Sequence, residues 1–332
     1  MRKDNKREGK KMKKIEKTVK SKCDELPLAV AITLPEENVP VKGIVQISHG
    51  MAEHKERYYP FMEFLANNGY IGVIHDHRGH GDSVKSEEDL GYFYDKTANY
   101  IIEDLHQITQ EIKKEYLDLP VYLFGHSMGS LVVRCYLKHY DNEIDKLIVC
   151  GAPCKNIGAG FGIALAKTIE KFKGDKYRSK LIQKLTFSSY PKKFKEEKKD
   201  ENCWISSEEE NKKEYNKDKK CGYIFTLNGF QNLYKLVQKT YSNKDWEKQN
   251  LDLPIFFIAG DEDPVIGNLQ KWINAYEFLQ KEIGYKNISH KLYKGRRHEL
   301  LNEDIKEMDI MNFQTFPLEH ILLNLSMEPL ME

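Results

Sequence analysis

Gly125-His126-Ser127-Met128-Gly129, directly after the apolar run Val121-Tyr122-Leu123-Phe124, is the stretch that decides the fold. The run predicts a buried strand, and the apolar residues from 130 to 137 predict a helix after it. A serine between two glycines at a strand–turn–helix junction is typical of a nucleophile elbow, in which a sharp turn exposes the hydroxyl group. A Cβ at either glycine would clash with neighbouring backbone. The alternative is an ordinary glycine-flanked turn, and the residues downstream argue against it.

Candidate partners for this serine follow two later strands. A serine hydroxyl is a weak nucleophile that needs a base, and the base needs an acid to orient it. With an elbow of this kind, the acid and then the histidine follow the serine along the chain. A predicted strand over 253–259 runs into Gly260-Asp261-Glu262-Asp263-Pro264, and another over 288–293 runs into Gly295-Arg296-Arg297-His298. We therefore expect Ser127, Asp263 and His298 to act as nucleophile, acid and base. Asp261 is the alternative acid, but Pro264 fixes the backbone beside Asp263.

Two turns further upstream are also polar. The predicted strand over 43–48 ends in His49-Gly50-Met51-Ala52-Glu53-His54, and a His-Gly turn at this place commonly supplies one N–H group of an oxyanion hole. The second N–H comes from the residue after the nucleophile, so the expected donors are Met51 and Met128. We interpret the other turn, Asp76-His77-Arg78-Gly79-His80-Gly81-Asp82-Ser83, as structural, because its glycines allow a tight loop and its charges can tie strand ends together.

Four motifs in this order carry a resemblance to a known family. They are His49-Gly50-Met51-Ala52-Glu53-His54 with Arg57-Tyr58, the turn over 76–83, the elbow over 125–129, and Gly295-Arg296-Arg297-His298-Glu299. Over residues 16 to 310 the chain resembles the monoacylglycerol lipase and lysophospholipase branch of the α/β-hydrolase superfamily. Together the motifs are specific for the branch, and they are much less specific for the substrate.

The resemblance implies an α/β-hydrolase fold, with a mostly parallel central sheet flanked by helices and an inserted, mainly helical cap. It implies a serine hydrolase that cleaves a fatty-acid ester of a monoacylglycerol or lysophospholipid and needs no cofactor or metal. The family's roles fall on Ser127, Asp263 and His298, and its oxyanion donors fall on Met51 and Met128. We expect the oxyanion loop or the polar end of the substrate pocket to involve His49, Gly50, Glu53 and Arg57.

Composition narrows the classes of partner and of location that this protein can have. The chain has 332 residues with a formal net charge of +1, which gives no reason to expect a nucleic acid as partner. Its six cysteines match no zinc-binding spacing, and we interpret them as reduced thiols of a cytoplasmic protein, with a Cys203–Cys221 bridge left open. No apolar stretch is long enough for a transmembrane helix. No apolar segment follows the basic N-terminus, so we expect no signal peptide.

A long insertion separates two parts of the predicted core. About ninety residues lie between the strand over 147–150 and the strand that begins at Leu253, too many for a simple connection. We therefore expect a cap over residues 153–246, between core segments at 16–152 and 247–332. The cap begins and ends with apolar stretches that contain Phe161 and Phe225, around a middle rich in Lys and Glu. The apolar ends are expected to line an acyl pocket, or else to dock the cap on the core.

The first residues of the chain are basic, and a segment near its end is apolar. Residues 1–15 are strongly basic, which favours a disordered, solvated tail over transient contact with anionic lipid. Near the other end, Pro317 breaks any helix. Leu318 to Leu325 is apolar enough to dock on the core or on another subunit.

Other functions fit the same sequence features. A peptidase of the same fold would remove an N-terminal residue from short peptides, and it would need buried carboxylates in the cap to bind the free amine. A thioesterase or short-chain esterase would use the same chemistry on another substrate. A ligand receptor on a hydrolase scaffold would bind tightly without turnover.

Overall fold

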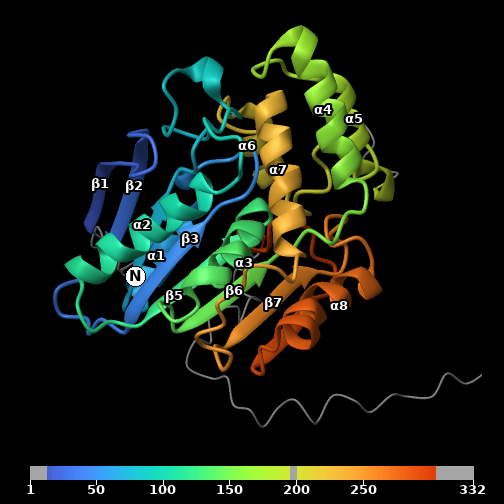
Figure 1. The fold of residues 1–332 in the computed structure, drawn as a ribbon. Coiled ribbons are helices and arrows are strands. Elements are labelled where there is room, and N and C mark those ends of the chain that lie inside the picture. The colour runs from blue at the N-terminus through green and yellow to red at the C-terminus, as the bar shows by residue number, and fades with distance from the viewer. Residues whose placement is uncertain (1–12, 195–199, 304–332) are drawn as a thin grey trace, which may run out of the picture.

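An eight-stranded sheet organises the protein (Figure 1). The computed structural model describes residues 13–194 and 200–303. The strand order is β1-β2-β4-β3-β5-β6-β7-β8. From β4 to β8 all neighbouring strands are parallel, whereas β2 is antiparallel to both β1 and β4. The strands are β1 Lys13–Lys20, β2 Pro27–Leu34, β3 Gly43–Ser48, β4 Tyr70–His75, β5 Val121–His126, β6 Lys146–Cys150, β7 Ile255–Gly260 and β8 Ile288–Tyr293.

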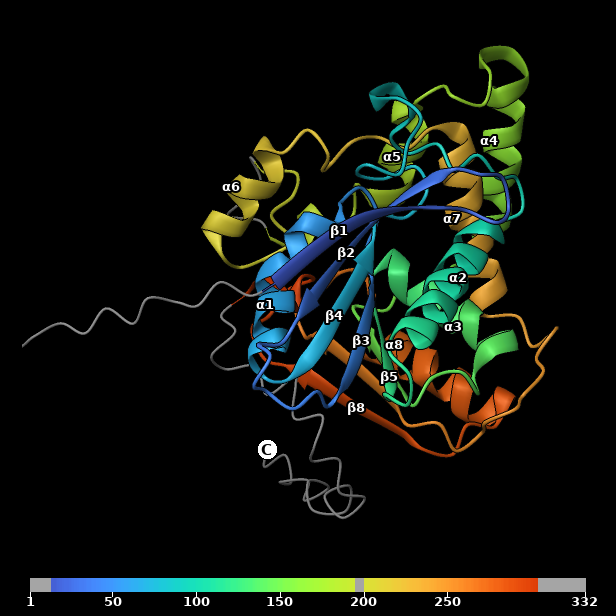
Figure 2. The same ribbon diagram turned by 90° about the vertical axis from the view of Figure 1, so that its left-hand side faces the viewer.

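The central strands form because both of their faces are covered by helices. Every residue of β3 and β4 is buried, as expected for parallel strands with apolar runs. Successive residues point to opposite faces, so Leu123 joins one apolar cluster and Phe124 the other. Helix α1 (Tyr59–Asn67) packs on the Phe124 face. The opposite face carries α2 (Tyr100–Glu115), α3 (Met128–Tyr140) and α8 (Leu269–Glu277) (Figure 2). The predicted sheet with helices on both faces is confirmed.

The β1–β2 hairpin was not predicted from the sequence. Its outer strand β1 is largely charged and alternates between exposed and half-buried residues, with Ile15 and Val19 turned toward the core. β1 therefore occupies the edge of the sheet, where lysines discourage pairing with other chains. Residues 13–15, which the sequence assigned to the basic tail, belong to this strand. The rest of that tail lies outside the described residues, as do Pro317 and the apolar stretch after it.

Between β6 and β7, within the expected cap, the described residues form the helices α4 (Ala159–Lys173), α5 (Lys180–Phe187), α6 (Glu209–Lys217) and α7 (Leu227–Thr240). Helix α7 buries Phe230, Leu233 and Leu236, and it packs against α4 and against α3 of the core. Figure 2 shows α4, α5 and α7 grouped together, with α6 on the opposite side of the molecule beside α1. The cap thus reaches the core at two separated places.

Short one-turn helices complete the structure. They are η1 Lys55–Tyr58, η2 Glu87–Asp89, η3 Pro191–Lys193 and η6 Leu300–Asn302, and a wider turn, η5 Phe278–Ile283, continues α8. None of the six cysteines forms a disulfide bond, so the bridge left open between Cys203 and Cys221 is not made. Within residues 13–194 and 200–303, no helix combines the length and the apolar character needed to cross a bilayer.

The turn after β4 ties the strand ends together through its charges. The Asp76 carboxylate accepts hydrogen bonds from the backbone N–H groups of Lys55, at 2.7 Å, and Asp82, at 2.8 Å. The completely buried Arg78 donates to Asp104 at 2.7 Å. These bonds stay within the core, which agrees with the structural interpretation of this turn.

Candidate active site

Ser127 stands alone between β5 and α3, in the conformation of a nucleophile elbow. Its backbone has φ 54° and ψ −118°, a region that side-chain-bearing residues rarely occupy. The turn closes this tightly because both flanking glycines lie against other atoms. A Cβ on Gly129 would sit 2.0 Å from the carbonyl oxygen of Ser48, and one on Gly125 would sit 2.5 Å from a methyl group of Val133. The clash expected from the sequence is therefore present at both glycines.

His298 and Asp263 form a buried pair. The Nδ1 atom of His298 lies 2.8 Å from Oδ2 of Asp263, and both side chains are almost completely buried. The other carboxylate oxygen accepts the backbone N–H of Val265 at 2.8 Å, which fixes the orientation of the acid. With Nδ1–H donating a hydrogen bond to the carboxylate, Nε2 is left as the nitrogen that can accept a proton.

The alternative acid lies in another environment. Asp261 is exposed, and its carboxylate accepts the backbone N–H of Gly295 at 2.8 Å, in the turn after β8. The structure therefore brings Asp263, and not Asp261, to the imidazole of His298.

The expected oxyanion donors lie on either side of the serine. Met128 is the first residue of α3, where N–H groups have no partner within the helix. The turn that carries Met51 lies against the elbow, since a Cβ on Gly50 would be 3.2 Å from the Cβ of Ser127. This arrangement places a helix N-terminus and an adjacent backbone turn beside the hydroxyl, where negative charge develops during acyl transfer.

A buried ion-pair network supports this turn. Glu53 accepts the backbone N–H of Gly50 and, at 2.9 Å, the hydroxyl of Tyr58. Arg57 lies 3.3 Å from Glu53 and donates two hydrogen bonds to Glu299, at 2.5 and 2.7 Å. Since Glu299 follows His298 directly, the network joins the oxyanion turn to the loop of the candidate base. These bonds hold the turn that carries Met51 in place, and the roles expected of Glu53 and Arg57 in catalysis or substrate binding stay predictions.

His126 extends the network below the elbow. Its Nδ1 atom lies 3.2 Å from a Glu53 carboxylate oxygen, and its Nε2 atom lies 3.2 Å from the carbonyl oxygen of His298. Burial opposes a charge on the imidazole, but the hydrogen bond and negative charge of Glu53 outweigh it and raise the pKa of His126. Burial likewise opposes the charge on Glu53, and the bond to His126 still holds the pKa of that carboxyl well below its usual range.

The cap joins the same network through α6. Asn211 accepts a hydrogen bond from Arg57 at 2.8 Å and donates one to Glu299 at 2.9 Å. The ring of Tyr215, one helical turn further on, lies 4.8 Å from the Arg57 guanidinium. Arg57 is therefore shared between the oxyanion turn, the histidine loop and the cap.

Replacing Arg57 by leucine should lower the free energy of unfolding by about 3 to 5 kcal/mol, because it leaves the Glu299 charge buried without its main partner. Denaturant unfolding measures this loss. The double variant Arg57→Leu/Glu299→Leu should recover part of it, since no buried charge is then stranded. A double variant that is less stable than Arg57→Leu would contradict the role given to this pair.

Comparison with known proteins agrees with this geometry. Residues 39–305 match the family model described as serine aminopeptidase, S33. The chain belongs to this family. A monoacylglycerol lipase of Mycolicibacterium smegmatis is 29% identical over 133 residues, 39% of this chain and 45% of that protein. The monoglyceride lipase of Homo sapiens is 33% identical over 91 residues, 27% of this chain and 28% of that protein. The aligned segments thus span less than half the length of these curated relatives.

A solved structure extends the likeness over most of this chain. A thermostable carboxyl esterase from Bacillus coagulans, solved in complex with glycerol, has 27% identity and a TM-score of 0.77, and the match covers 88% of this chain and 93% of the esterase. This likeness confirms the α/β-hydrolase fold and the family that the motifs predicted.

Four buried histidines surround the oxyanion turn of this S33 protein. The ring of His49 lies 4.4 Å from that of His77 and 5.3 Å from that of His80, and His75 lies 4.9 Å from His77. His49 Nδ1 bonds to the carbonyl of Gly50 at 2.8 Å, and its Nε2 accepts the N–H of His77 at 2.8 Å. His49 is therefore a neutral imidazole, and its two hydrogen bonds hold the turn that carries Met51 in position.

Burial keeps all four imidazoles neutral. It lowers the pKa of His49 to about 4 and those of His75 and His80 to about 3, and it lowers the pKa of His77 well below its usual value. An unfolded chain would protonate them below their ordinary pKa of about 6.5. Acid therefore favours the unfolded state, by about 1.4 kcal/mol per pH unit for each histidine.

Replacing His75 by phenylalanine should make the protein more resistant to acid. Among the described residues neither ring nitrogen of His75 has a hydrogen-bond partner, so an apolar ring of similar shape loses no bond. Between pH 7 and pH 4.5 the variant should lose about 2 to 3 kcal/mol less unfolding free energy than the original protein. Urea unfolding across this range measures the difference. His139→Gln, at a side chain 38% exposed on α3, is the control. Parallel curves for His75→Phe would show that folding does not lower the pKa of His75.

The two aromatic residues expected at an acyl pocket lie in different environments. Phe161 is 70% exposed on α4. Phe225 is completely buried, with its ring 5.4 Å from Phe93 and 5.2 Å from His80. Phe225 thus docks the cap on the core, one of the two alternatives for this segment. A role of either residue in substrate binding stays a prediction.

Sequence reasoning missed an aromatic residue of the cap that lies beside the candidate base. The ring of Trp204 lies 5.2 Å from the imidazole of His298, and the ring of Tyr190 lies 5.1 Å from that of Trp204. Trp204 belongs to the polar middle of the cap, which was expected to form an exposed face, and Tyr190 comes just before this segment. A tryptophan inside a Lys- and Glu-rich segment was the available signal.

Proposed function

We propose that the protein is a serine carboxylic-ester hydrolase that cleaves a fatty-acyl ester of a monoacylglycerol or lysophospholipid. The observation that carries the proposal is the 2.8 Å bond between His298 Nδ1 and Asp263, on loops beside a serine with positive φ. This bond leaves Nε2 of the imidazole as the base, which a serine nucleophile needs.

The reaction follows from these positions. His298 Nε2 takes the proton of the Ser127 hydroxyl as Oγ attacks the ester carbonyl. The backbone N–H groups of Met51 and Met128 donate to the resulting oxyanion. Collapse of this intermediate breaks the bond to the alcohol, which leaves with the proton from His298. Water, deprotonated by the same imidazole, then releases the fatty acid from Ser127.

The relatives support the choice of substrate. Several are named as monoglyceride lipases, and others as a phospholipase or a probable lysophospholipase. The structurally similar carboxyl esterase was solved with glycerol, the alcohol that a monoacylglycerol would release. These names concern the relatives, and they bring the substrate class to this chain as part of the proposal. The absence of disulfides among the six cysteines supports a cytoplasmic location.

An aminopeptidase is the second candidate, because the matching family carries that description. Such an enzyme needs a buried carboxylate in the cap to bind the substrate's free amine. None of the cap carboxylates that the structure describes is buried. Glu53 and Glu299, the buried acids closest to the triad, are already paired with Arg57. These observations favour the ester.

Fatty-acid release from a long-chain monoacylglycerol tests the proposal, with lysophosphatidylcholine, a short-chain ester and an aminoacyl amide in parallel. Release from the monoacylglycerol or the lysophospholipid is the expected result. Cleavage of the amide without release of fatty acid from either lipid would establish the aminopeptidase instead. Hydrolysis of the short ester alone would agree with the proposed mechanism but contradict the proposed substrate class.

A further inference from the structure

A turn at the end of α6 presents two metal-binding side chains together. The N–H of Cys221 donates to the carbonyl of Asp218 at 3.0 Å, which closes a turn over these four residues and brings the first and last close in space. The N–H of Lys220 donates to Oδ1 of Asp218 at 2.7 Å. This bond fixes the carboxylate and leaves its second oxygen, Oδ2, directed away from the turn.

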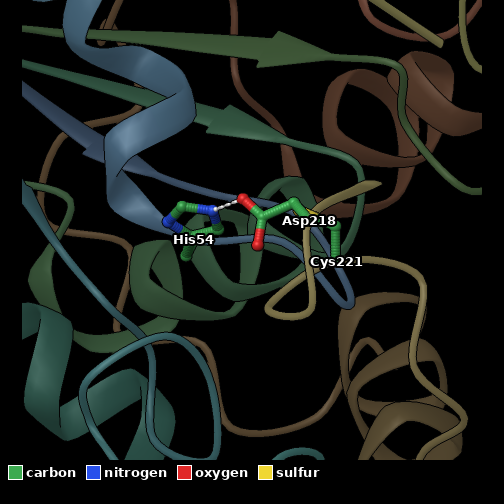
Figure 3. Close-up of side chains that lie close together, drawn as sticks. All are labelled: His54, Asp218 and Cys221. Carbon is green, nitrogen blue, oxygen red and sulfur yellow. Dashed lines mark hydrogen bonds and ion pairs between the residues drawn. The ribbon is translucent and has the colours of Figure 1, made fainter. Parts of the chain in front are cut away.

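A third donor comes from the oxyanion loop. Oδ2 of Asp218 lies 2.7 Å from Nε2 of His54, and the donor atoms of His54, Asp218 and Cys221 all lie within 4.8 Å of one another (Figure 3). The turn is docked on this loop by two bonds to the carbonyl of Ala52, from the N–H of Gly222 at 2.9 Å and from the hydroxyl of Tyr215 at 3.2 Å. The three donors are therefore held in place by the backbone around them.

The positive charges near this cluster are neutralised by other acids. The Lys55 ammonium lies 3.0 Å from Asp76 and 2.6 Å from Asp82, and the Lys220 ammonium also bonds to Asp82. Arg57 is paired with Glu53 and Glu299, as described above. No cation that the structure describes in this region thus needs the Asp218 carboxylate as its only partner.

The donor set suits a particular class of ion. Imidazole, carboxylate and thiolate together favour zinc and similar ions over magnesium or calcium, which prefer oxygen ligands. His54 and Cys221 are buried, whereas the side chain of Asp218 is 35% exposed. An ion can reach the cluster past Asp218, and water can complete a tetrahedral shell on that side.

We propose that His54, Asp218 and Cys221 bind one zinc ion, or another divalent ion with the same ligand preference, between the cap and the oxyanion loop. Binding displaces the proton of the Cys221 thiol, and the resulting thiolate becomes a ligand. The ion also replaces the proton that His54 Nε2 and Asp218 Oδ2 share, which moves to Nδ1 of the imidazole or to water. His54 lies three residues after Met51, so the bound ion would fix the cap on the loop that supplies an oxyanion donor. The sequence indicated no metal, because the donors come from segments 164 residues apart and the cysteines match no zinc spacing.

Cobalt(II) titration of the full chain, reduced and freed of metal with a chelator, tests this site. The original protein should show thiolate-to-cobalt charge-transfer absorption that saturates at one ion per chain and is abolished by zinc. Cys221→Ser should lose this absorption, whereas Cys203→Ser, at a second buried cysteine of the cap, should keep it. Asp218→Asn should weaken cobalt binding by about tenfold or more, since even indirect partners of metal ligands contribute that much.

A second measurement keeps the test independent of how Cys221→Ser folds. Zinc should raise the melting temperature of the original protein and of Cys203→Ser, raise that of Asp218→Asn much less, and magnesium should have no effect. Missing charge-transfer absorption in the original protein, or absorption that survives in a folded Cys221→Ser variant, would overturn the proposal. Neither measurement uses ester hydrolysis, so the metal site is tested independently of the proposed function.

Discussion

Ser127→Ala should fold normally and lose about six orders of magnitude in ester hydrolysis, which is the scale seen when a serine hydrolase loses its nucleophile. The hydroxyl forms the acyl-enzyme, and no other described side chain occupies the elbow between β5 and α3. Ser127 is half-buried and alanine needs the same backbone conformation, so the free energy of unfolding should change by less than about 1 kcal/mol. Fatty-acid release, measured beside denaturant unfolding, checks both statements.

Ser130→Ala is the matched control for this variant. Its hydroxyl donates to the carbonyl of Ser127 at 2.6 Å, so its removal disturbs the same turn without removing the nucleophile. We expect this control to keep activity to within about tenfold, in line with the loss of about 1 kcal/mol for one hydrogen bond. Hydrolysis by a folded Ser127→Ala variant at more than a trace level would show that another residue forms the acyl-enzyme.

Asp263→Asn should reduce kcat by about 10⁴-fold, because an amide can donate to Nδ1 of His298 and so stabilise the wrong tautomer. In that tautomer Nε2 carries the proton and cannot accept one from Ser127. The Asp263 side chain is completely buried, and the amide of asparagine has nearly the same volume as the carboxylate. A comparison of kcat with KM should place the loss in kcat, because the acid is needed for the chemical step.

Asp261→Asn tests whether the assignment of the acid is right. This carboxylate caps the N–H of Gly295 on an exposed turn, and an amide oxygen can accept the same bond. Activity should therefore stay within a few-fold of the original. If Asp261→Asn were the more damaging change, the role of acid would move to Asp261, against the geometry around His298.

Local patterns predicted the elements that carry the candidate triad. The strands before Ser127 and Asp263 are mainly apolar, and the strand before His298 mixes apolar and polar residues. Each candidate residue follows its strand within a few positions. Pro264 favoured Asp263 over Asp261 as the acid, and the structure places the Asp263 carboxylate at the imidazole of His298. These features depend on short stretches of chain, which is why sequence alone was sufficient.

Features that depend on distant residues were not predictable in this way. Residues 13–15, at the start of β1, resemble the end of a solvated basic tail until β2 is known to lie beside them. Arg57 and Glu299 are 242 residues apart, and nothing in either segment indicates the other. Trp204 lies in a polar stretch, and only the path of the cap brings its ring to His298.

The strand order also sets when the site is assembled during synthesis. From β5 onward each new strand is added beside the previous one, so β5, β6, β7 and β8 extend the sheet in the order in which the ribosome makes them. Domains begin to form as their N-terminal parts emerge. Ser127 is therefore made early, whereas His298 follows the last strand that the structure describes. A growing chain therefore holds the candidate nucleophile without its candidate base until that outermost strand is in place, and we expect it to hydrolyse no ester while its cap is still being folded.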